Sequence, residues 1–119
     1  MRYSMIATLL ALLIAAPVRA EVAYGPDSVE KGKSLFLNNC TQCHGNDGKS
    51  QVDVISDATD LTEPLLYRNG TTDKDIESSI RDGRNGVMPA WGTVLAGADD
   101  IAHLRNFIKS LWPADKRPK

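Results

Sequence analysis

The sequence contains few of the residues that build disulfide scaffolds, nucleic-acid interfaces or aromatic-rich cores. Its 119 residues include two cysteines, two histidines and 6% aromatic side chains. Two cysteines allow at most one disulfide, which excludes the densely cross-linked folds of small secreted domains. Fourteen basic residues face 15 acidic ones, for a formal net charge of -1, so the basic excess typical of nucleic-acid-binding domains is absent. We therefore expect no nucleic-acid partner.

Hydrophobic alternation of the kind found in β-strands is also scarce. The stretch "QVDVI" at 51–55 is short and lies within a polar, glycine-containing segment from 45 to 62. Half-buried strands need apolar residues at every second position over several residues, and no segment shows this convincingly. The sequence therefore predicts an all-α fold with long connections.

The uncharged run near the N-terminus is too short to cross a bilayer. "MIATLLALLIAA" at 5–16 has twelve residues, whereas a transmembrane helix needs about 20. It follows an arginine and precedes Val18-Arg19-Ala20, whose small first and third residues are typical of a signal-peptidase site. We expect residues 1–20 to be a signal peptide and residues 21–119 to form one domain. The mature protein is then expected to be a periplasmic monomer without a stable membrane span.

Local signals predict two helices in the first half of the domain. Asp27 and Glu30 have the spacing of a capping box, so the first helix is expected to begin near Asp27, after Pro26. A short helix is expected around Glu63–Arg68, because Pro64 suits the first turn of a helix, where its missing N–H does little harm.

Two further helices are predicted in the second half. Thr72–Asp82 begins with cap residues Thr72 and Asp75 and stops at Gly83. The segment Ala98–Trp112 has apolar residues at intervals of three and four, which predicts an amphipathic helix. These apolar positions are Ile101, Leu104, Ile108 and Leu111.

The motif "CTQCH" at 40–44 allows several kinds of site. A disulfide between Cys40 and Cys43 would close a very small loop and stabilise little. A thioredoxin-type redox pair requires a neighbouring βαβ pattern, and no strand precedes this one. A zinc site could use both cysteines with His44 and His103, but structural zinc sites usually space their ligand pairs differently.

The fourth interpretation is covalent haem, because C-x-x-C-H is the attachment motif of c-type haem. Cys40 and Cys43 would add to the porphyrin vinyl groups, and His44 would reach the iron as the proximal ligand. The two-residue spacing brings both sulfurs to one edge of the macrocycle and sets the next side chain beneath its centre. The motif follows a predicted signal peptide in a chain with no other cysteine, which favours one haem c over the alternatives.

Candidates for the second axial ligand are Met88, His103, or none. Met88 is the only methionine left after the predicted cleavage, and it lies in "RNGVMPAWG", between glycines and a proline. Such a shaped loop differs from the helix faces where methionine usually fills gaps in a core. His103 stands beside the apolar face of the last predicted helix and is expected to be partly exposed. We therefore expect Met88 to be the ligand.

These residues resemble class I cytochromes c over essentially the whole mature chain. The resemblance rests on "GKSLFLNNCTQCHG", "GVMPAW" and "DDIAHLRNFIKSLW". It implies a cytochrome c fold in which the N- and C-terminal helices cross beside the haem. Gly32 and Phe36 match the contact positions of the first helix, and the implied partners on the last helix are Leu104, Phe107 and Ile108.

The resemblance leaves the surroundings of the haem incomplete. Many members of the family carry a proline after the attachment histidine, and its backbone carbonyl accepts the ring N–H. No proline occurs here between His44 and Pro64, so the acceptor is unassigned. Trp91 resembles a haem-edge aromatic and is a candidate partner of a propionate, as are Arg81 and Arg84.

The function implied is one-electron transport in the periplasm, with no bond rearrangement catalysed by the chain. The resemblance extends to cytochromes that serve quinoprotein (PQQ) alcohol dehydrogenases and to haem domains of oxidase subunits. We therefore expect a donor dehydrogenase, which could be PQQ-dependent, and a terminal oxidase or another cytochrome as acceptor. The alternatives are a haem-based sensor or peroxidase-type module in which Met88 dissociates, and a disulfide-active oxidoreductase.

Overall fold

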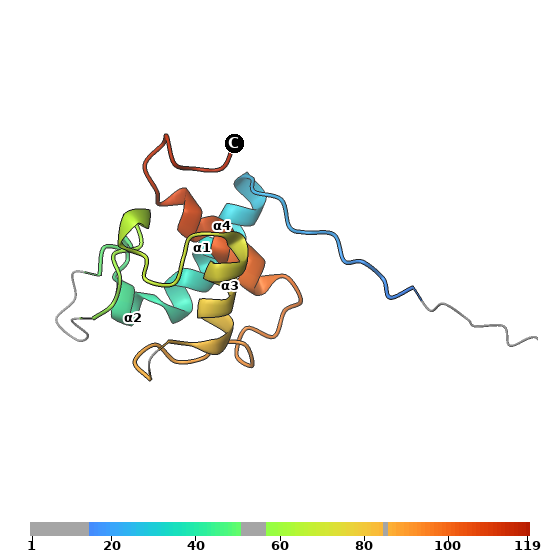
Figure 1. Cartoon of the computed structure of the whole chain (residues 1–119), viewed down its shortest axis with the longest axis horizontal. Helices are drawn as coiled ribbons and strands as arrows, with labels where there is room; N and C mark the ends of the chain where they lie inside the picture. Colours follow the sequence, from blue (N-terminus) through green and yellow to red (C-terminus); the bar gives the residue numbers. More distant parts are fainter. Residues whose placement is uncertain (1–14, 51–56, 85) are drawn as a thin grey trace, which may run out of the picture.

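The computed structural model describes residues 15–50, 57–84 and 86–119, and the regular elements within these ranges are helices (Figure 1). One isolated antiparallel bridge joins Arg84 and Met88. The all-α prediction is confirmed for this part of the chain, while the stretch "QVDVI" and residues 1–14 lie outside the described residues. The elements are α1 (Pro26–Asn39), α2 (Thr41–His44), η1 (Pro64–Leu66), α3 (Asp73–Asp82) and α4 (Asp100–Ser110).

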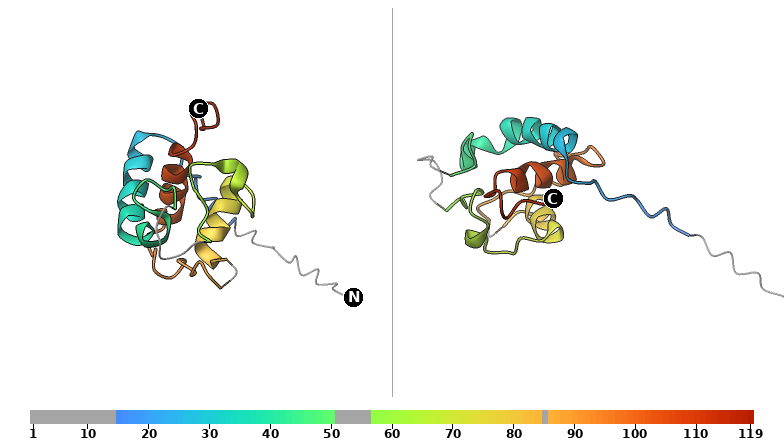
Figure 2. Two further views of the ribbon diagram at one scale, coloured as in Figure 1. Left: turned by 90° about the vertical axis from the view of Figure 1, so that its left-hand side faces the viewer. Right: turned by 90° about the horizontal axis from the view of Figure 1, so that it is seen from above.

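The helix α4 packs against both α1 and α3 and forms the centre of the domain (Figure 2). At the crossing with α1, a Cβ added to Gly32 would overlap the backbone carbonyl of His103. The rings of Phe36 and Phe107 meet beside it with centroids 5.0 Å apart. The predicted contact between the first and last helices is therefore confirmed. The buried apolar core consists of Phe36, Ile76, Ile80, Leu95, Leu104, Phe107, Ile108 and Trp112.

The start of α3 follows the sequence prediction closely. Thr72 is the N-cap, its hydroxyl accepts a hydrogen bond from the Asp75 N–H, and the Asp75 carboxylate accepts one from the Thr72 N–H. This reciprocal arrangement satisfies two N–H groups that the first turn would otherwise leave unpaired. Gly83, with φ of 71°, ends the helix.

Three helix boundaries differ from the prediction. The capping box predicted at Asp27 is wrong, because α1 begins at Pro26 with Gly25 as a cap that makes no side-chain hydrogen bond. Proline at the first helical position is already held at a helical φ, which places Asp27 inside the first turn. The element expected at 63–68 is one 3₁₀ turn, since Tyr67 is extended. Finally, α4 is shorter at both ends than 98–112.

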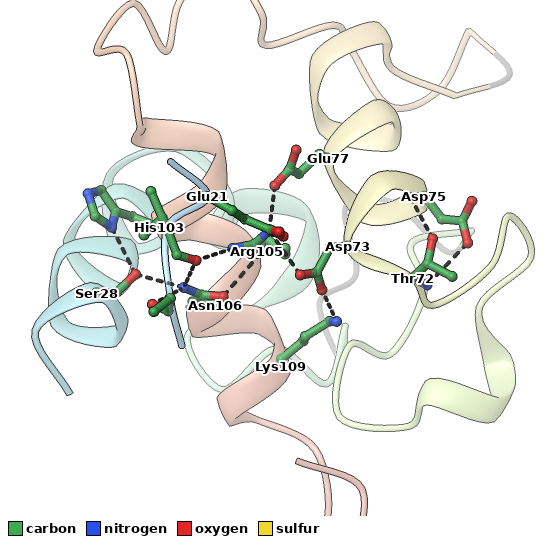
Figure 3. A network of polar contacts seen from close by, with 12 residues as sticks. Glu21, Ser28, Thr72, Asp73, Asp75, Glu77, His103, Arg105, Asn106 and Lys109 are labelled. Atoms are coloured by element: carbon green, nitrogen blue, oxygen red, sulfur yellow. Dashed lines mark hydrogen bonds and ion pairs between the residues drawn. The ribbon is translucent and has the colours of Figure 1, made fainter. Parts of the chain in front are cut away.

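A buried arginine fastens the segment preceding α1 to the domain (Figure 3). Arg105 of α4 is 1% exposed and lies within 3.3 Å of Glu21, 3.0 Å of Asp73 and 2.7 Å of Glu77. Its guanidinium also donates to the Val22 carbonyl at 2.7 Å. A buried charge is tolerated only when it is paired and hydrogen-bonded, and these four partners satisfy that requirement.

Neighbouring polar groups extend this cluster. Asn106 is 2% exposed and donates to the Ala23 carbonyl and to the Ser28 hydroxyl. Lys109 pairs with Asp73. Residues 15–20, which precede the fastened segment, are exposed and have no regular structure. No helix in the described ranges is long and apolar enough to cross a membrane.

Candidate functional site

The cysteine–histidine motif lies on a single short turn of helix that continues from α1. Cys40 caps the end of α1 and the start of α2. The N–H groups of Cys43 and His44 both donate to the Cys40 carbonyl, at 3.3 and 3.0 Å. Gly45, with φ of 73°, ends the turn. This local winding holds the two thiols and the imidazole within one helical turn.

The motif and the Met88 loop line the same cavity, whose volume is about 410 Å³. Most of its wall is apolar, and it is formed by residues of α1, α2, α3 and α4 together with the segments that connect them. The four residues predicted from the sequence as attachment or ligand groups, which are Cys40, Cys43, His44 and Met88, all belong to this wall. Their helical neighbours in the wall include Phe36, Ile76, Ile80, Leu104 and Ile108.

The acceptor of the His44 ring N–H, which the sequence left unassigned, is a backbone carbonyl. His44 Nδ1 lies 3.1 Å from the Thr59 carbonyl oxygen. Because a carbonyl oxygen only accepts, Nδ1 carries the proton and Nε2 keeps its lone pair in the neutral ring. Burial lowers the pKa of the His44 imidazole, and the hydrogen bond to Thr59 opposes this only in part. The side chain is therefore held in the neutral form that binds metals.

The two cysteines are partly buried, unpaired thiols. Both are free, and burial, with Cys43 adding to it, raises the pKa of Cys40 to about 12. A redox-active pair requires the opposite shift, since the thiolate is the reactive form. In the described residues no group of three or more His, Cys, Asp or Glu side chains is arranged to hold a metal ion. Neither the thioredoxin-type nor the zinc interpretation gains support.

A tight loop anchored to the end of α3 carries Met88. Arg84 and Met88 exchange backbone hydrogen bonds at 3.0 and 3.1 Å, and the Trp91 N–H donates to the Ile80 carbonyl at 3.0 Å. Gly83 has a positive φ, and a Cβ there would overlap the Met88 carbonyl. The loop can close in this way because glycine tolerates both constraints.

Only some of the residues predicted from the sequence as propionate partners line the cavity. Trp91 and Arg84 line the cavity, although the Arg84 guanidinium is already bonded to the hydroxyls of Ser78 and Ser79. Arg81 does not line it and lies 3.9 Å from Glu77. Arg68 is a further cationic residue of the cavity wall, and it was not identified from the sequence.

His103 is partly buried and lies outside the cavity wall. Its Nδ1 is 2.8 Å from the hydroxyl of Ser28 on α1. The side chain therefore belongs to the α1–α4 contact, whereas Met88, whose thioether can ligate haem iron, lines the cavity together with His44.

Tyr67 is a cavity residue that the sequence did not identify. Its hydroxyl donates to the Leu61 carbonyl at 2.8 Å and accepts from the Trp112 indole at 3.1 Å. Burial raises the pKa of Tyr67 to about 12, so the phenol stays neutral and keeps its proton for this bond. Local sequence gives no signal of this position for Tyr67, because its partner Trp112 lies 45 residues away.

The donor set in this cavity suits haem c. Two thiols lie on one turn, and a neutral imidazole follows them directly. A thioether comes from a separate loop, and the remaining wall is mainly apolar. This combination matches the covalent attachment and His/Met ligation of c-type haem, and the cavity itself lies between the helices that the family resemblance places beside the cofactor.

This chain is similar to subunits of cytochrome c oxidases and to cytochromes of known structure. Residues 27–108 match the family model described as cytochrome c oxidase, cbb3-type, subunit III. A cbb3-type cytochrome c oxidase subunit CcoP from Rubrivivax gelatinosus is 32% identical over 105 residues, covering 88% of this chain and 33% of that protein. The chain thus spans about a third of the length of the curated relatives it matches.

Solved structures agree with this match. Cytochrome cL from Hyphomicrobium denitrificans has a TM-score of 0.58 and 30% identity, and the match covers 69% of this chain and 46% of that one. Cytochrome cL from Methylophaga aminisulfidivorans has a TM-score of 0.63 and 24% identity, over 76% of this chain and 60% of that one. The predicted cytochrome c fold is confirmed. The chain belongs to the family of cbb3-type cytochrome c oxidase subunit III and is a small c-type cytochrome whose cofactor is haem c.

Proposed function

We propose that the protein is a periplasmic one-electron carrier whose haem is attached through Cys40 and Cys43 and ligated by His44 and Met88. The observation that carries this proposal is that all four side chains line one cavity, although the motif and the methionine loop are far apart in the sequence. When bound, the haem supplies one-electron chemistry by cycling between Fe(II) and Fe(III).

The chain's own residues would hold and tune this group. The mainly apolar cavity wall would limit the access of water, and the Thr59 carbonyl fixes the orientation and tautomer of His44. The thioether of Met88 raises the reduction potential relative to a second imidazole. Because both axial positions would be filled, the chain itself catalyses no bond rearrangement in this account.

The proposed acceptor is a terminal oxidase and the proposed donor is a quinoprotein dehydrogenase. The acceptor is supported by relatives that are named as cbb3-type oxidase subunits. The donor is supported by the resemblance of the segment 57–91 to cytochromes that serve PQQ-dependent alcohol dehydrogenases. Cleavage after Ala20 would remove two arginines and no acid, which takes the formal net charge from -1 to -3. Partners are then expected to present basic docking surfaces.

The function is tested with the protein expressed together with haem-attachment machinery and exported. A c-type carrier keeps its colour and its added haem mass after acid denaturation and titrates reversibly with one electron. The native ferrous protein should bind carbon monoxide poorly, because Met88 would hold the iron on the side opposite His44. Ready carbon monoxide binding would instead favour the sensor or peroxidase-type module, and a colourless protein with free thiols would favour a disulfide oxidoreductase.

The partners are tested separately by stopped-flow reduction with a purified PQQ-dependent alcohol dehydrogenase and oxidation with a cbb3-type oxidase. Both rates should fall as ionic strength rises, because attraction between opposite charges is screened by salt. Rates that do not respond to ionic strength would contradict the proposed electrostatic docking, and would leave the carrier function itself standing.

A further inference from the structure

Ser50 shares the carbonyl that holds the candidate haem ligand. The Ser50 hydroxyl donates to the Thr59 carbonyl oxygen at 2.5 Å, the same atom that accepts from His44 Nδ1 at 3.1 Å. Ser50 Oγ is itself 3.4 Å from His44 Nδ1, which is near the outer limit for a hydrogen bond and contributes little. Two donors thus converge on one carbonyl, and the hydroxyl is the closer one.

The backbone around Ser50 is built to keep the hydroxyl in this place. Ser50 has φ of 59°, and it is the one non-glycine residue with a positive φ among the described residues. Its N–H donates to the His44 carbonyl at 2.9 Å, which closes the chain back onto the motif. A left-handed backbone is costly for a residue with a Cβ, and such conformations concentrate at functional sites.

We propose that Ser50 is a positioning residue that raises the reduction potential of the haem by weakening the hydrogen bond between His44 and Thr59. This inference rests on the proposed function, in which His44 ligates the iron. A carbonyl oxygen that already accepts a short hydroxyl hydrogen bond has less electron density for a second donor. The N–H bond of the imidazole is therefore less polarised. The imidazole is a weaker electron donor to the metal than it would be if the Thr59 carbonyl accepted a hydrogen bond from His44 alone.

The direction of the effect follows from the way in which a hydrogen bond to a metal-binding histidine changes the basicity of the ring. A stronger acceptor on the ring N–H raises the basicity of the histidine, and a more basic ligand stabilises Fe(III) over Fe(II). When the Ser50 hydroxyl is removed, the Thr59 carbonyl accepts a hydrogen bond from His44 alone. The ligand then becomes more basic, and the reduction potential falls.

The test compares Ser50→Ala and Ser50→Gly in the haem-loaded protein. Both variants lack the hydroxyl, but only glycine relieves the positive φ, so a hydroxyl effect should be the same in both. At a potential equal to the wild-type midpoint, the ratio of oxidised to reduced protein should be at least threefold higher in each variant. This ratio corresponds to a fall in the midpoint potential of about 28 mV, by the one-electron relation of 59 mV per tenfold change. Ser34→Ala, on the exposed side of α1, is the control and should leave the potential unchanged.

A second readout follows the hydrogen bond directly. In the proton NMR spectrum of the ferrous protein, the His44 Nδ1–H signal should move downfield in both variants and exchange more slowly with solvent. An unchanged or higher potential in proteins that keep the wild-type axial ligands would overturn the inference, as would a fall seen in only one variant. If the wild-type spectrum lacks His/Met ligation, the proposed function fails instead, so the two failures are distinguishable.

Discussion

The Nδ1 atom of His44 lies 3.1 Å from the backbone carbonyl of Thr59, a residue 15 positions further along the chain. This contact fixes the tautomer of the ring and joins the end of the motif to the long polar connection that follows it. It also supplies the acceptor that the family resemblance assigns to a proline, which is absent here between His44 and Pro64. The connection after the motif thus has a role in orienting the candidate ligand.

Substitution of Gly83 by alanine should displace the Met88 loop. A Cβ at Gly83 would overlap the Met88 carbonyl and crowd Pro89 and Ala90. Gly86 is a matched control, because its φ of 69° is nearly equal to the 71° of Gly83 but nothing lies within 4 Å of its Cβ position. We expect Gly83→Ala to weaken the sulfur-to-iron absorption band and Gly86→Ala to keep it. Equal losses in both would mean that the positive φ alone matters.

Substitution of Gly32 by alanine should separate α1 from α4. The added Cβ would overlap the His103 carbonyl and press on the Cβ of Phe107, and overpacking of this kind typically costs about 1–3 kcal/mol. The free energy of unfolding in urea measures this loss. Ser34→Ala, on the exposed side of the same helix, is the control, and a change of less than about 0.5 kcal/mol is expected there. Comparable losses in both variants would refute the close crossing.

Loss of the Arg105 side chain should be among the most destabilising single changes. Arg105→Ala leaves the carboxylates of Asp73 and Glu77 without the cation between them, and because these carboxylates are partly exposed we expect a loss of about 1–3 kcal/mol. Arg81→Ala is the control because Arg81 is exposed and also faces Glu77, at 3.9 Å. An exposed pair contributes about 0–1 kcal/mol. Urea unfolding measures the free energy of unfolding of both variants. Similar losses in the two would contradict the role given to Arg105.

The stability should decrease in acid partly through Asp73. Burial raises the pKa of Asp73, but the hydrogen bond from Lys109 and the charges of Arg105 and Lys109 outweigh it, and the net shift is downward from 3.8. A carboxylate with a depressed folded-state pKa contributes stability above the unfolded value, and this contribution is lost as pH falls through the folded value. Asp73→Asn should therefore flatten the acid limb of the plot of unfolding midpoint against pH.

Glu30→Gln, on the exposed side of α1, serves as the control for this measurement and should keep the wild-type slope. The account of the Arg105 cluster would be contradicted if Asp73→Asn had the same pH dependence as the wild-type protein. The neutral variant should also be less stable than wild type at neutral pH, because it no longer pairs with Lys109 and Arg105 as an anion.

The sequence predicted well those parts of the fold that depend on local chemistry. The α3 cap was recognised because Thr72 and Asp75 satisfy each other within one turn. The prediction for the start of α1 was wrong. Asp27 and Glu30 have the spacing of a capping box, but the rigid ring of Pro26 starts the helix earlier. The Gly32–Phe36 contact came from the family resemblance, because the partner helix lies about 70 residues away.

The four candidate attachment and ligand side chains were predicted from the sequence, whereas the groups that hold them in place were missed. Cys40, Cys43, His44 and Met88 have distinctive chemistry in distinctive spacing, and all four line the cavity. The Thr59 carbonyl carries no signal, because every residue offers the same acceptor and only the folded chain decides which one meets the ring. The Ser50 hydroxyl was missed for the same reason, since its importance depends on that carbonyl.

The most direct test of His/Met ligation is the near-infrared spectrum of the oxidised, haem-loaded protein and of its Met88→Ala variant. The account predicts a weak sulfur-to-iron band in the wild-type protein that is lost in Met88→Ala. It also predicts that His103→Gln keeps the band, because His103 lies outside the cavity wall and bonds to Ser28. A Met88→Ala protein that retained the band would contradict the assignment of Met88, and with it the proposed axial pair.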